Sequence, residues 1–382
     1  MPYSERKISV RQPVYFDNAA TTFPKPLSVR NAVSNTIAYA GGNPGRGGHP
    51  LAKRAGETVY RARESAAQLF GAQPENVVLT LNCTHALNLA IYGLLYTGGH
   101  AVISSMEHNS VFRPIAALAR ERIITYSIAQ VSPDSAQTLA NFRRLLRPNT
   151  KAVICSLVSN VTGQILPWRE LAAMCKENGI AFIADGAQGC GVLPVSLSDG
   201  ISVLCTAGHK GLYGIMGSGL LVTDGKIPLK PLMQGGTGSL SMSAAQPDFL
   251  PDALESGTVA VPAAAALDAG IRFIAQRGMT AIFRHETALC ERLIQGLKQK
   301  PNVTVFRDAQ AEYAPVVSFV LDGEPPADTA ARLAAKGFCV RAGLHCAPLA
   351  HNTLGTSAEG TVRFSPSVFS TAAETDAFLH AL

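Results

Sequence analysis

Short apolar runs alternate with longer stretches of helical periodicity between residues 76 and 223. The apolar runs predict strands, and the amphipathic stretches between them predict helices. We expect strands at residues 76–81, 101–104, 123–128, 151–157, 180–184, 202–206 and 219–223, and helices at residues 84–95, 111–122 and 167–178. Strands that alternate with helices are typical of βαβ units, so this region should form a mainly parallel sheet that is buried on both faces.

The pattern changes after Pro262, where two long helical stretches are followed by shorter mixed elements. We expect helices at residues 263–276, 280–298, 327–336 and 372–382, and strands at residues 303–306, 316–321 and 339–342. This mixture predicts a smaller α+β unit, so we place a boundary near residue 260.

The composition is that of a globular chain: it has 382 residues, of which 47% are hydrophobic, and a formal net charge of +6. The basic residues are scattered rather than clustered, so no nucleic-acid partner is expected. The sequence contains no apolar run long enough to span a membrane, so no membrane association is expected. Residues 1–11 are polar and lack the apolar centre of a signal peptide, which predicts a cytoplasmic protein.

The chain contains eight cysteines and no Cys-x-x-Cys pair. Several of the cysteines lie inside apolar runs, which argues against a disulfide framework or a metal site and for reduced thiols. We expect one reactive thiol and seven buried ones among these eight.

Two charged residues stand just beyond predicted strands: Asp185 follows residues 180–184, and Lys210 follows residues 202–206 after a short link. Ligands of open parallel sheets bind beyond the carboxyl ends of the strands. A lysine that forms a Schiff base and a carboxylate that keeps a pyridine nitrogen protonated are what pyridoxal phosphate (PLP) chemistry requires. Taken alone, Lys210 could be structural, and Asp185 could cap a helix or pair with a cation.

Seven short segments, in order along nearly the whole chain, resemble the class V aminotransferase group and, within it, the cysteine desulfurases. They are residues 15–22 (YFDNAATT), 106–110 (MEHNS), 159–163 (SNVTG), 184–188 (ADGAQ), 208–210 (GHK), 256–258 (SGT) and 341–346 (RAGLHC). The resemblance implies the α/β fold of PLP-dependent transferases of fold type I. It assigns residues 17–260 to a large PLP-binding domain with a mainly parallel sheet, and residues 1–16 and 261–382 to a small α+β domain.

The resemblance also implies how PLP is held. Lys210 matches the Schiff-base lysine, and Asp185 matches the partner of the ring nitrogen. His108 matches the residue that stacks on the ring, and Gln188 matches the neighbour of the phenolic oxygen. Standing alone, His108 could equally be a capping or core histidine.

Three further residues match contacts to the phosphate. Thr84 lies at the start of a predicted helix, where free backbone N–H groups favour an anion, and His209 precedes the matched lysine. Thr258 matches a residue that reaches the phosphate from the other subunit, which implies a homodimer. Ala207 stands where the family often has a Ser or Thr that donates to this phosphate.

Three residues match contacts to an amino-acid substrate: Asn160, Arg341 and Arg363. A guanidinium such as that of Arg363 can clamp an α-carboxylate with two parallel hydrogen bonds. The simpler readings are that Arg363 pairs with a structural acid and that Asn160 shapes a turn.

Cys346 distinguishes between reactions of the family. Glycine, histidine and proline around it predict a loop, and thiols beside cations are good nucleophiles. The segment resembles that of the short-loop (group II, SUF-type) desulfurases, with Leu344 in place of one histidine. This resemblance implies conversion of L-cysteine to L-alanine with a persulfide on Cys346, which passes to an acceptor protein or a small thiol; selenocysteine is a second candidate substrate.

Other interpretations remain open. An aminotransferase or another PLP β-lyase would use Lys210 and Asp185 in the same way and would not need Cys346. A non-catalytic sulfur-carrier scaffold or regulatory subunit is a third interpretation, which the presence of Lys210, Asp185, His108 and Cys346 disfavours. Cys83 and His85 stand where desulfurases usually have Thr and Glu, which indicates a divergent branch.

Overall fold

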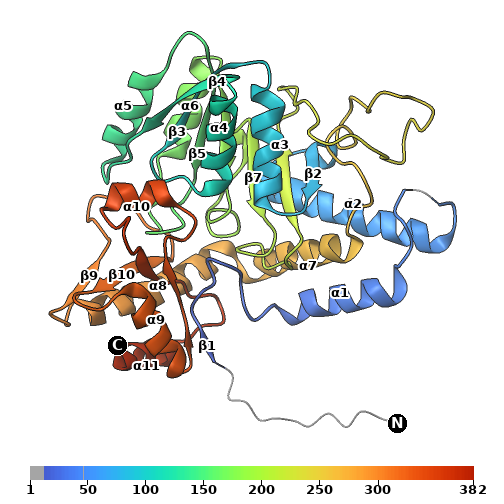
Figure 1. Cartoon of the computed structure of the whole chain (residues 1–382). Coiled ribbons are helices and arrows are strands. Elements are labelled where there is room, and N and C mark those ends of the chain that lie inside the picture. Colours follow the sequence, from blue (N-terminus) through green and yellow to red (C-terminus); the bar gives the residue numbers. More distant parts are fainter. Residues whose placement is uncertain (1–12, 46) are drawn as a thin grey trace, which may run out of the picture.

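The computed structural model describes residues 13–45 and 47–382, and its largest element is a seven-stranded sheet (Figure 1). In spatial order the strands are β2 (Val77–Thr80), β8 (Gly219–Thr223), β7 (Val203–Ala207), β6 (Ala181–Asp185), β5 (Thr150–Ser156), β3 (Gly99–Ser104) and β4 (Ile124–Ala129). Strand β8 runs antiparallel to both of its neighbours, and the other adjacent pairs are parallel. The predicted mainly parallel sheet is confirmed, and the predicted strand boundaries lie close to the observed ones.

Helices cover both faces of this sheet. One apolar core is shared with α3 (Cys83–Leu95) and α4 (Asn109–Arg120). The other is shared with α2 (Pro50–Phe70), α5 (Ser135–Leu145), α6 (Trp168–Glu177) and α7 (Val261–Arg277). Successive strand residues alternate between the cores, so Phe182 and Ile183 of β6 belong to different ones. The same alternation directs Asp185, the last residue of β6, toward the side on which α3 begins.

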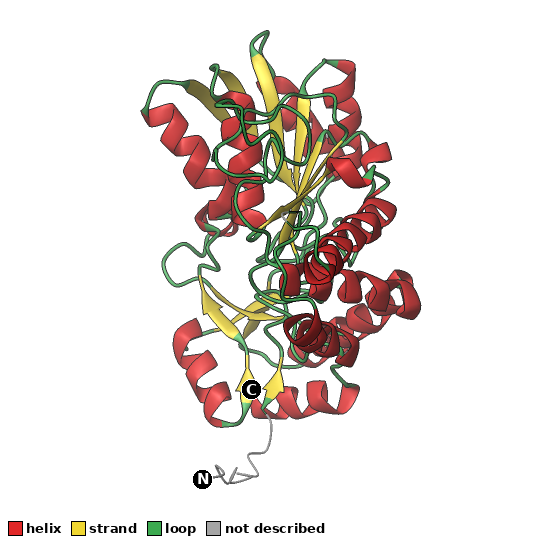
Figure 2. Ribbon diagram, turned by 90° about the vertical axis from the view of Figure 1, so that its right-hand side faces the viewer, coloured by secondary structure: helices red, strands yellow, loops and turns green. Residues whose placement is uncertain are grey.

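A second, four-stranded sheet is antiparallel and is built from the C-terminal part of the chain (Figure 2). Its strands, in spatial order, are β12 (Arg341–Gly343), β13 (Thr361–Phe364), β10 (Val317–Leu321) and β9 (Val303–Val305). They share a core with α8 (Met279–Leu297), α9 (Pro326–Ala335) and α11 (Ala372–Ala381). Near it, β1 (Val14–Tyr15) pairs in parallel with β11 (Phe338–Cys339), so the start of the described chain lies beside its C-terminal part.

Some elements differ from the sequence-based prediction. The single strand expected at residues 339–342 is divided into β11 and β12, which pair with different strands. The prediction missed α1 (Leu27–Tyr39), α2, α5, α10 (Pro348–Leu354) and the 3-10 turns η1 (Pro74–Asn76) and η2 (Leu197–Asp199). Helix α2 nevertheless carries a regular amphipathic pattern, with five alanines among its nine buried residues.

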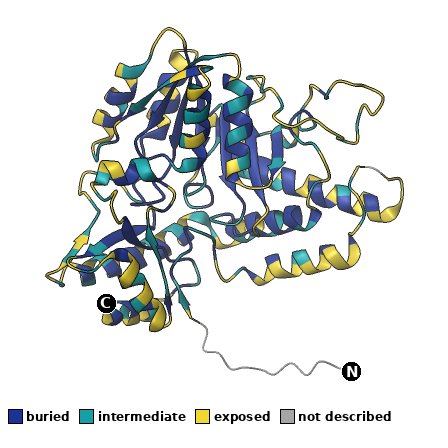
Figure 3. Ribbon diagram, viewed as in Figure 1, coloured by how far each residue is buried: buried dark blue, intermediate teal, exposed yellow. Residues whose placement is uncertain are grey.

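Burial follows this layered arrangement: the strands of the large sheet are buried, and the outer side of α1 and the long loop between β8 and α7 are exposed (Figure 3). Among the helices of the described residues, none is long and apolar enough to cross a bilayer. The prediction that residues 1–11 lack a signal peptide, and the assignment of residues 1–12 to the small domain, fall outside the described residues.

A buried ion pair attaches the loop before α7 to the large sheet. Arg63 of α2 contacts both carboxylate oxygens of Glu255, at 2.7 and 2.6 Å, and both side chains are about nine-tenths buried. The two side chains also bond the backbone of β2, at Val77 and Leu79. The pair therefore fixes the segment that carries Thr258, three residues after Glu255.

We expect Arg63→Met to lower the free energy of unfolding by about 3–5 kcal/mol, because it leaves the Glu255 carboxylate buried without a cation. The shift in the urea midpoint measures this. The control is Arg272→Met, which removes a surface pair with Asp268 one helical turn away and should cost less than about 1 kcal/mol. Equal shifts for the two variants would show that the Arg63 pair contributes no more than a surface contact.

A second buried acid lies between α8 and the loop after β7. Glu286 is 5% exposed and accepts a hydrogen bond from the Tyr213 hydroxyl at 3.1 Å. Burial raises the pKa of Glu286 to about 8, and the hydrogen bonds from Tyr213 and the Val368 backbone oppose this shift only in part. Because the pKa of Glu286 is higher in the folded state than in the unfolded chain, the stability that this group contributes is fully present at acidic pH. It is lost as the pH rises through about 8.

Glu286→Gln should therefore flatten the pH dependence of stability between about pH 4.5 and 8, since glutamine can still accept from Tyr213 and does not ionise. Urea unfolding of wild type and variant across this range measures the difference. Parallel curves for the two proteins would show that Glu286 does not titrate differently in the folded state.

Candidate active site

The candidate site lies where the carboxyl ends of β6 and β7 meet the first turns of α3 and α4. Asp185 ends β6, and Lys210 follows the end of β7 by three residues. His108 is the N-cap residue of α4, and Cys83 is the first residue of α3. Parallel neighbouring strands place their carboxyl ends at the same edge, so residues distant in sequence converge there.

An inner cavity of about 90 Å³ lies at this edge. Seven of the predicted site residues line it: Thr84, His108, Asn160, Asp185, Gln188, His209 and Lys210. The structure therefore brings together most of the residues that the sequence assigned to PLP. Ala207, where the family often has a hydroxyl, also lines this cavity.

Lys210 and Asp185 both line this cavity. The Lys210 amine has no hydrogen-bond partner within the part of the chain that the structure describes. Burial lowers the pKa of Lys210, and the Asp185 carboxylate opposes this shift. Asp185 is 4% exposed, and its Oδ1 accepts a hydrogen bond from the Ala187 N–H at 2.9 Å and lies 3.4 Å from Cys83 Sγ.

His108 both caps α4 and lines the cavity. Its Nδ1 accepts a hydrogen bond from the Ser110 N–H at 3.0 Å, which leaves the proton of the neutral ring on Nε2. Burial lowers the pKa of His108 to about 4, and the Asp185 carboxylate opposes this shift. Ser110 Oγ also lies 2.7 Å from Thr84 Oγ1, so it joins the first turns of α3 and α4. The imidazole is therefore neutral at physiological pH and fixed in orientation.

Glu107 is a buried acid behind His108 that the sequence analysis assigned no role. It accepts hydrogen bonds from the Ser156 backbone N–H at 2.9 Å and from Ser156 Oγ at 2.8 Å, and it also contacts Ser104. Burial raises the pKa of Glu107 to about 7. Glu107 joins the ends of β3 and β5 immediately before the α4 cap, and a carboxylate within the buried motif 106–110 was the signal that could have identified it.

Two predicted cofactor contacts have distinct environments. Gln188 donates a hydrogen bond from its amide to the Ala19 carbonyl at 2.8 Å, which leaves a second N–H available. His209 Nδ1 is buried and has no partner among the described residues. Buried polar atoms are rarely left unpaired, so this nitrogen indicates a group that the cavity is built to hold.

A larger outer cavity of about 640 Å³ opens next to the inner one. The two share Thr84, His108 and Ser110, and the outer cavity also includes Cys346. Cys346 is exposed, six of the other cysteines are buried, and Cys339 is intermediate. The Arg341 guanidinium lies 3.7 Å from Cys346 Sγ, where it can stabilise negative charge on the sulfur.

Arg363 and Asn160 connect the two sheets. Asn160 lines the inner cavity, whereas Arg341 and Arg363 line neither the inner nor the outer cavity. Arg363 is 1% exposed and pairs with Asp17 at 2.8 Å, as the structural reading of this arginine anticipated. It also donates to the Asn160 carbonyl at 3.0 Å, so these bonds use two of the five guanidinium N–H groups. The Asn160 amide donates to the His345 carbonyl at 2.8 Å, within the loop that carries Cys346.

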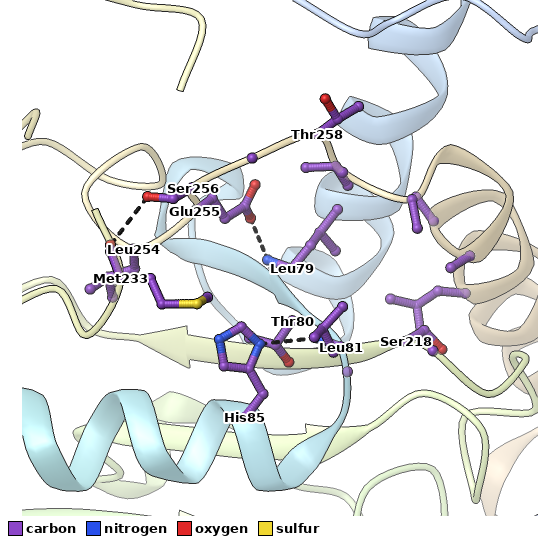
Figure 4. A pocket seen from close by; sticks show the side chains of 18 residues that line it. Leu79, Thr80, Leu81, His85, Ser218, Met233, Leu254, Glu255, Ser256 and Thr258 are labelled. Carbon is purple, nitrogen blue, oxygen red and sulfur yellow. Dashed lines mark hydrogen bonds between the residues drawn. The ribbon is translucent and has the colours of Figure 1, made fainter. Parts of the chain in front are cut away.

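Thr258 does not lie in the Lys210 cavity. It borders a separate cavity of about 170 Å³ together with His85, Met233 and Ser256 (Figure 4). This cavity and the Lys210 cavity have no lining residue in common. Within this subunit Thr258 therefore lines a different cavity from Thr84 and His209.

The sequence of the chain is similar to that of proteins of known family. A family model described as "Aminotransferase class-V" matches residues 14–378. A probable cysteine desulfurase of Mycolicibacterium paratuberculosis is 32% identical over 391 aligned positions, and this chain spans 56% of the length of that relative. A probable cysteine desulfurase of Methanothermobacter thermautotrophicus is 30% identical and is matched over 92% of its length by 96% of this chain.

Solved structures agree with the sequence relatives. The apo structure of a cysteine desulfurase from Thermococcus onnurineus superposes with a TM-score of 0.90 and 30% identity, over 96% of this chain and 93% of that one. The architecture is that of PLP-dependent transferases of fold type I, as the sequence predicted. With a match that extends over nearly its whole length, the chain belongs to the class V aminotransferase family.

Proposed function

We propose that this protein is a PLP-dependent cysteine desulfurase, which converts L-cysteine to L-alanine and keeps the sulfur as a persulfide on Cys346. One observation carries the proposal: the exposed thiol of Cys346 borders an outer cavity that shares residues with the cavity of Lys210 and Asp185. The names of the relatives support the same reaction. The rival reactions within the family need no thiol at this position.

The inner cavity fits PLP by the chemistry of its groups. It offers an amine without a hydrogen-bond partner, a buried carboxylate and an unpartnered imidazole nitrogen near the start of a helix. We assign the aldehyde carbon to Lys210, the ring nitrogen to Asp185, and the phosphate to Thr84 and His209 with the backbone N–H groups of α3. When bound, PLP supplies an electron sink for the bonds at the substrate Cα.

We assign ring stacking to His108 and contact with the phenolic oxygen to Gln188. His108 lines the inner cavity as a neutral ring in a fixed orientation, which suits stacking. Gln188 keeps one amide N–H free for an oxygen acceptor.

Arg363 suits the α-carboxylate of an amino acid. Its pair with Asp17 holds the guanidinium in place, and three of its five N–H groups are not used by the bonds to Asp17 and Asn160. Arg341 lies beside Cys346, and we assign it to the substrate and to the sulfur that Cys346 receives. Asn160 positions both Arg363 and the loop of Cys346, because its carbonyl accepts a hydrogen bond from Arg363 and its side-chain amide donates one to the His345 carbonyl.

Lys210 would transfer protons, and Cys346 would accept the sulfur. Burial favours the neutral Lys210 amine, the form that takes a proton from the substrate Cα. The Cys346 thiolate then forms a bond to the substrate sulfur while the sulfur–Cβ bond breaks. The electron pair of that bond stays with the carbon skeleton, which takes up a proton at Cβ, regains the Cα proton from Lys210 and leaves as alanine. The same attack would act on selenocysteine, and an acceptor protein or small thiol would remove the persulfide.

We infer that the enzyme is a homodimer in which Thr258 of one subunit reaches the phosphate in the other. The position of Thr258 in a cavity other than that of its own Lys210 supports this. Three exposed apolar residues, Leu81, Met216 and Met233, line or adjoin the Thr258 cavity and would be covered by a second subunit.

We also propose a division of the chain into two domains and a cellular compartment for the protein. We propose that residues 17–260 form the PLP-binding domain and that residues 1–16 and 261–382 form the small domain, as the pairing of β1 with β11 supports. Eight free cysteines suit a reducing compartment such as the cytoplasm.

The reaction is tested by alanine and sulfide release from L-cysteine in the presence of a reducing thiol. Wild type should release both products, and Cys346→Ala should fall to background while keeping bound PLP, because only the sulfur acceptor is lost. Cys339→Ala is the matched control, since Cys339 lies in β11 and borders neither cavity. Full activity in Cys346→Ala would favour an aminotransferase or another β-lyase.

Selective alkylation tests the accessibility of the thiol without any substrate. At about pH 8, brief iodoacetamide treatment should label Cys346 before the six buried cysteines. Burial raises the pKa of Cys175 and Cys190 to about 12. It also raises the pKa of the other buried thiols, which are those of Cys83, Cys155, Cys205 and Cys290. Peptide mass spectrometry identifies the labelled site. Equal or earlier labelling of a buried cysteine would contradict the exposure on which the proposal depends.

A further inference from the structure

The loop that carries Cys346 has an unusual backbone. His345 and Cys346 both have positive φ angles, of 49° and 56°. Residues other than glycine rarely adopt positive φ angles. Among the described residues, His345 and Cys346 are the one pair of consecutive non-glycine residues with such angles. Such a conformation persists when the surroundings determine it, so the contacts of the loop explain how the thiol is presented.

Three hydrogen bonds hold the backbone of this loop. The Asn109 N–H donates to the Cys346 carbonyl at 2.8 Å, and the Asn160 amide donates to the His345 carbonyl at 2.8 Å. Within the loop, the Ala347 N–H donates to the Leu344 carbonyl at 2.8 Å. These bonds fix the two carbonyls next to the thiol, but none of them fixes the His345 side chain.

The His345 imidazole belongs to a chain of buried side chains that ends at Thr356. His345 and His351 are 2% and 0% exposed, and their rings are stacked with Nδ1 of His345 3.5 Å from Nε2 of His351. His345 Nε2 lies 3.3 Å from the Arg341 carbonyl, and His351 Nδ1 lies 2.7 Å from Thr356 Oγ1. The chain therefore runs from α10 and the turn after it back to the strand that carries Arg341.

The acceptor at one end determines the proton positions along this chain. The Arg341 carbonyl can only accept, so His345 Nε2 carries a proton. Burial lowers the pKa of His345 to about 2 and also lowers that of His351, so both rings are neutral. His345 Nδ1 must then accept from His351 Nε2–H, and His351 Nδ1 must accept from the Thr356 hydroxyl. The Thr356 hydroxyl, the two imidazole rings and the Arg341 carbonyl are therefore all hydrogen-bonded only when each group donates toward Arg341.

We propose that His351 and Thr356 are positioning residues for the sulfur-accepting thiol, acting through the directed chain Thr356 to His351 to His345 to the Arg341 carbonyl. Neither residue borders the inner or the outer cavity, and their side chains reach the Cys346 loop through the ring of His345. The chain fixes the ring of His345 next to Cys346, and it ends on the residue whose guanidinium lies 3.7 Å from Cys346 Sγ. The inference rests on the proposed function, because it takes Cys346 to be the nucleophile.

Thr356→Val tests the chain with little change in shape, since it removes the hydroxyl and keeps the backbone bonds of residue 356 to His351 and Gly360. We expect kcat for alanine release from L-cysteine to fall about tenfold or more, because a displaced nucleophile reacts slowly. KM and PLP content should be unchanged. Thr356→Ser should restore the rate because it restores the donor. The matched control is Thr353→Val, which removes a hydroxyl of α10 outside the chain.

Hydrogen exchange gives a readout that does not depend on the reaction. The Asn109 amide donates to the Cys346 carbonyl, so we expect it to exchange about fivefold faster in Thr356→Val than in wild type or Thr353→Val. His351→Phe, which keeps an aromatic ring but no nitrogen, should behave like Thr356→Val. If wild type releases no sulfide, the proposed function fails and the exchange rates alone decide whether the chain holds the loop. Exchange and kcat in Thr356→Val equal to those in Thr353→Val would overturn the proposal.

Discussion

The placement of Lys210 and Asp185 at one edge of the large sheet is the constraint on which the rest of the site depends. A carboxylate that is 4% exposed and an amine without a hydrogen-bond partner are each costly to bury alone. They share a cavity because β6 and β7 are adjacent and parallel, with Asp185 opposite Cys205. Helices cover both faces of the sheet, and α3 and α4 begin at this edge, so their first turns complete the cavity.

A second constraint connects this cavity to the smaller sheet. Asn160, which follows β5, bonds Arg363 of β13 through its carbonyl and the Cys346 loop through its amide. Asp17, beyond β1, holds the other side of the same guanidinium. The residues that we assign to the substrate carboxylate and to sulfur transfer are thus joined by hydrogen bonds, and a shift in one part of this group moves the others.

Much of this arrangement could be predicted from the sequence, for identifiable reasons. Buried strands such as β5 and β6 are short apolar runs with clear ends, and Asp185 and Lys210 stand just at or beyond such ends. Helix α2 was missed although residues 50–70 carry a regular amphipathic pattern from which it could have been predicted. The roles of Ser110 and His351 could not be predicted, since each depends on a partner that only the fold brings close. The strand expected at residues 339–342 was too long because its two halves pair with different strands.

The most direct test of sulfur transfer to Cys346 is mass spectrometry of the protein after one turnover with L-cysteine and no reducing agent. We expect one additional sulfur atom on the peptide that contains Cys346 and one alanine released per subunit, because the thiol keeps the sulfur until an acceptor removes it. Alanine release without added sulfur on this peptide, or added sulfur on a different cysteine, would contradict the assignment of Cys346 as the sulfur acceptor.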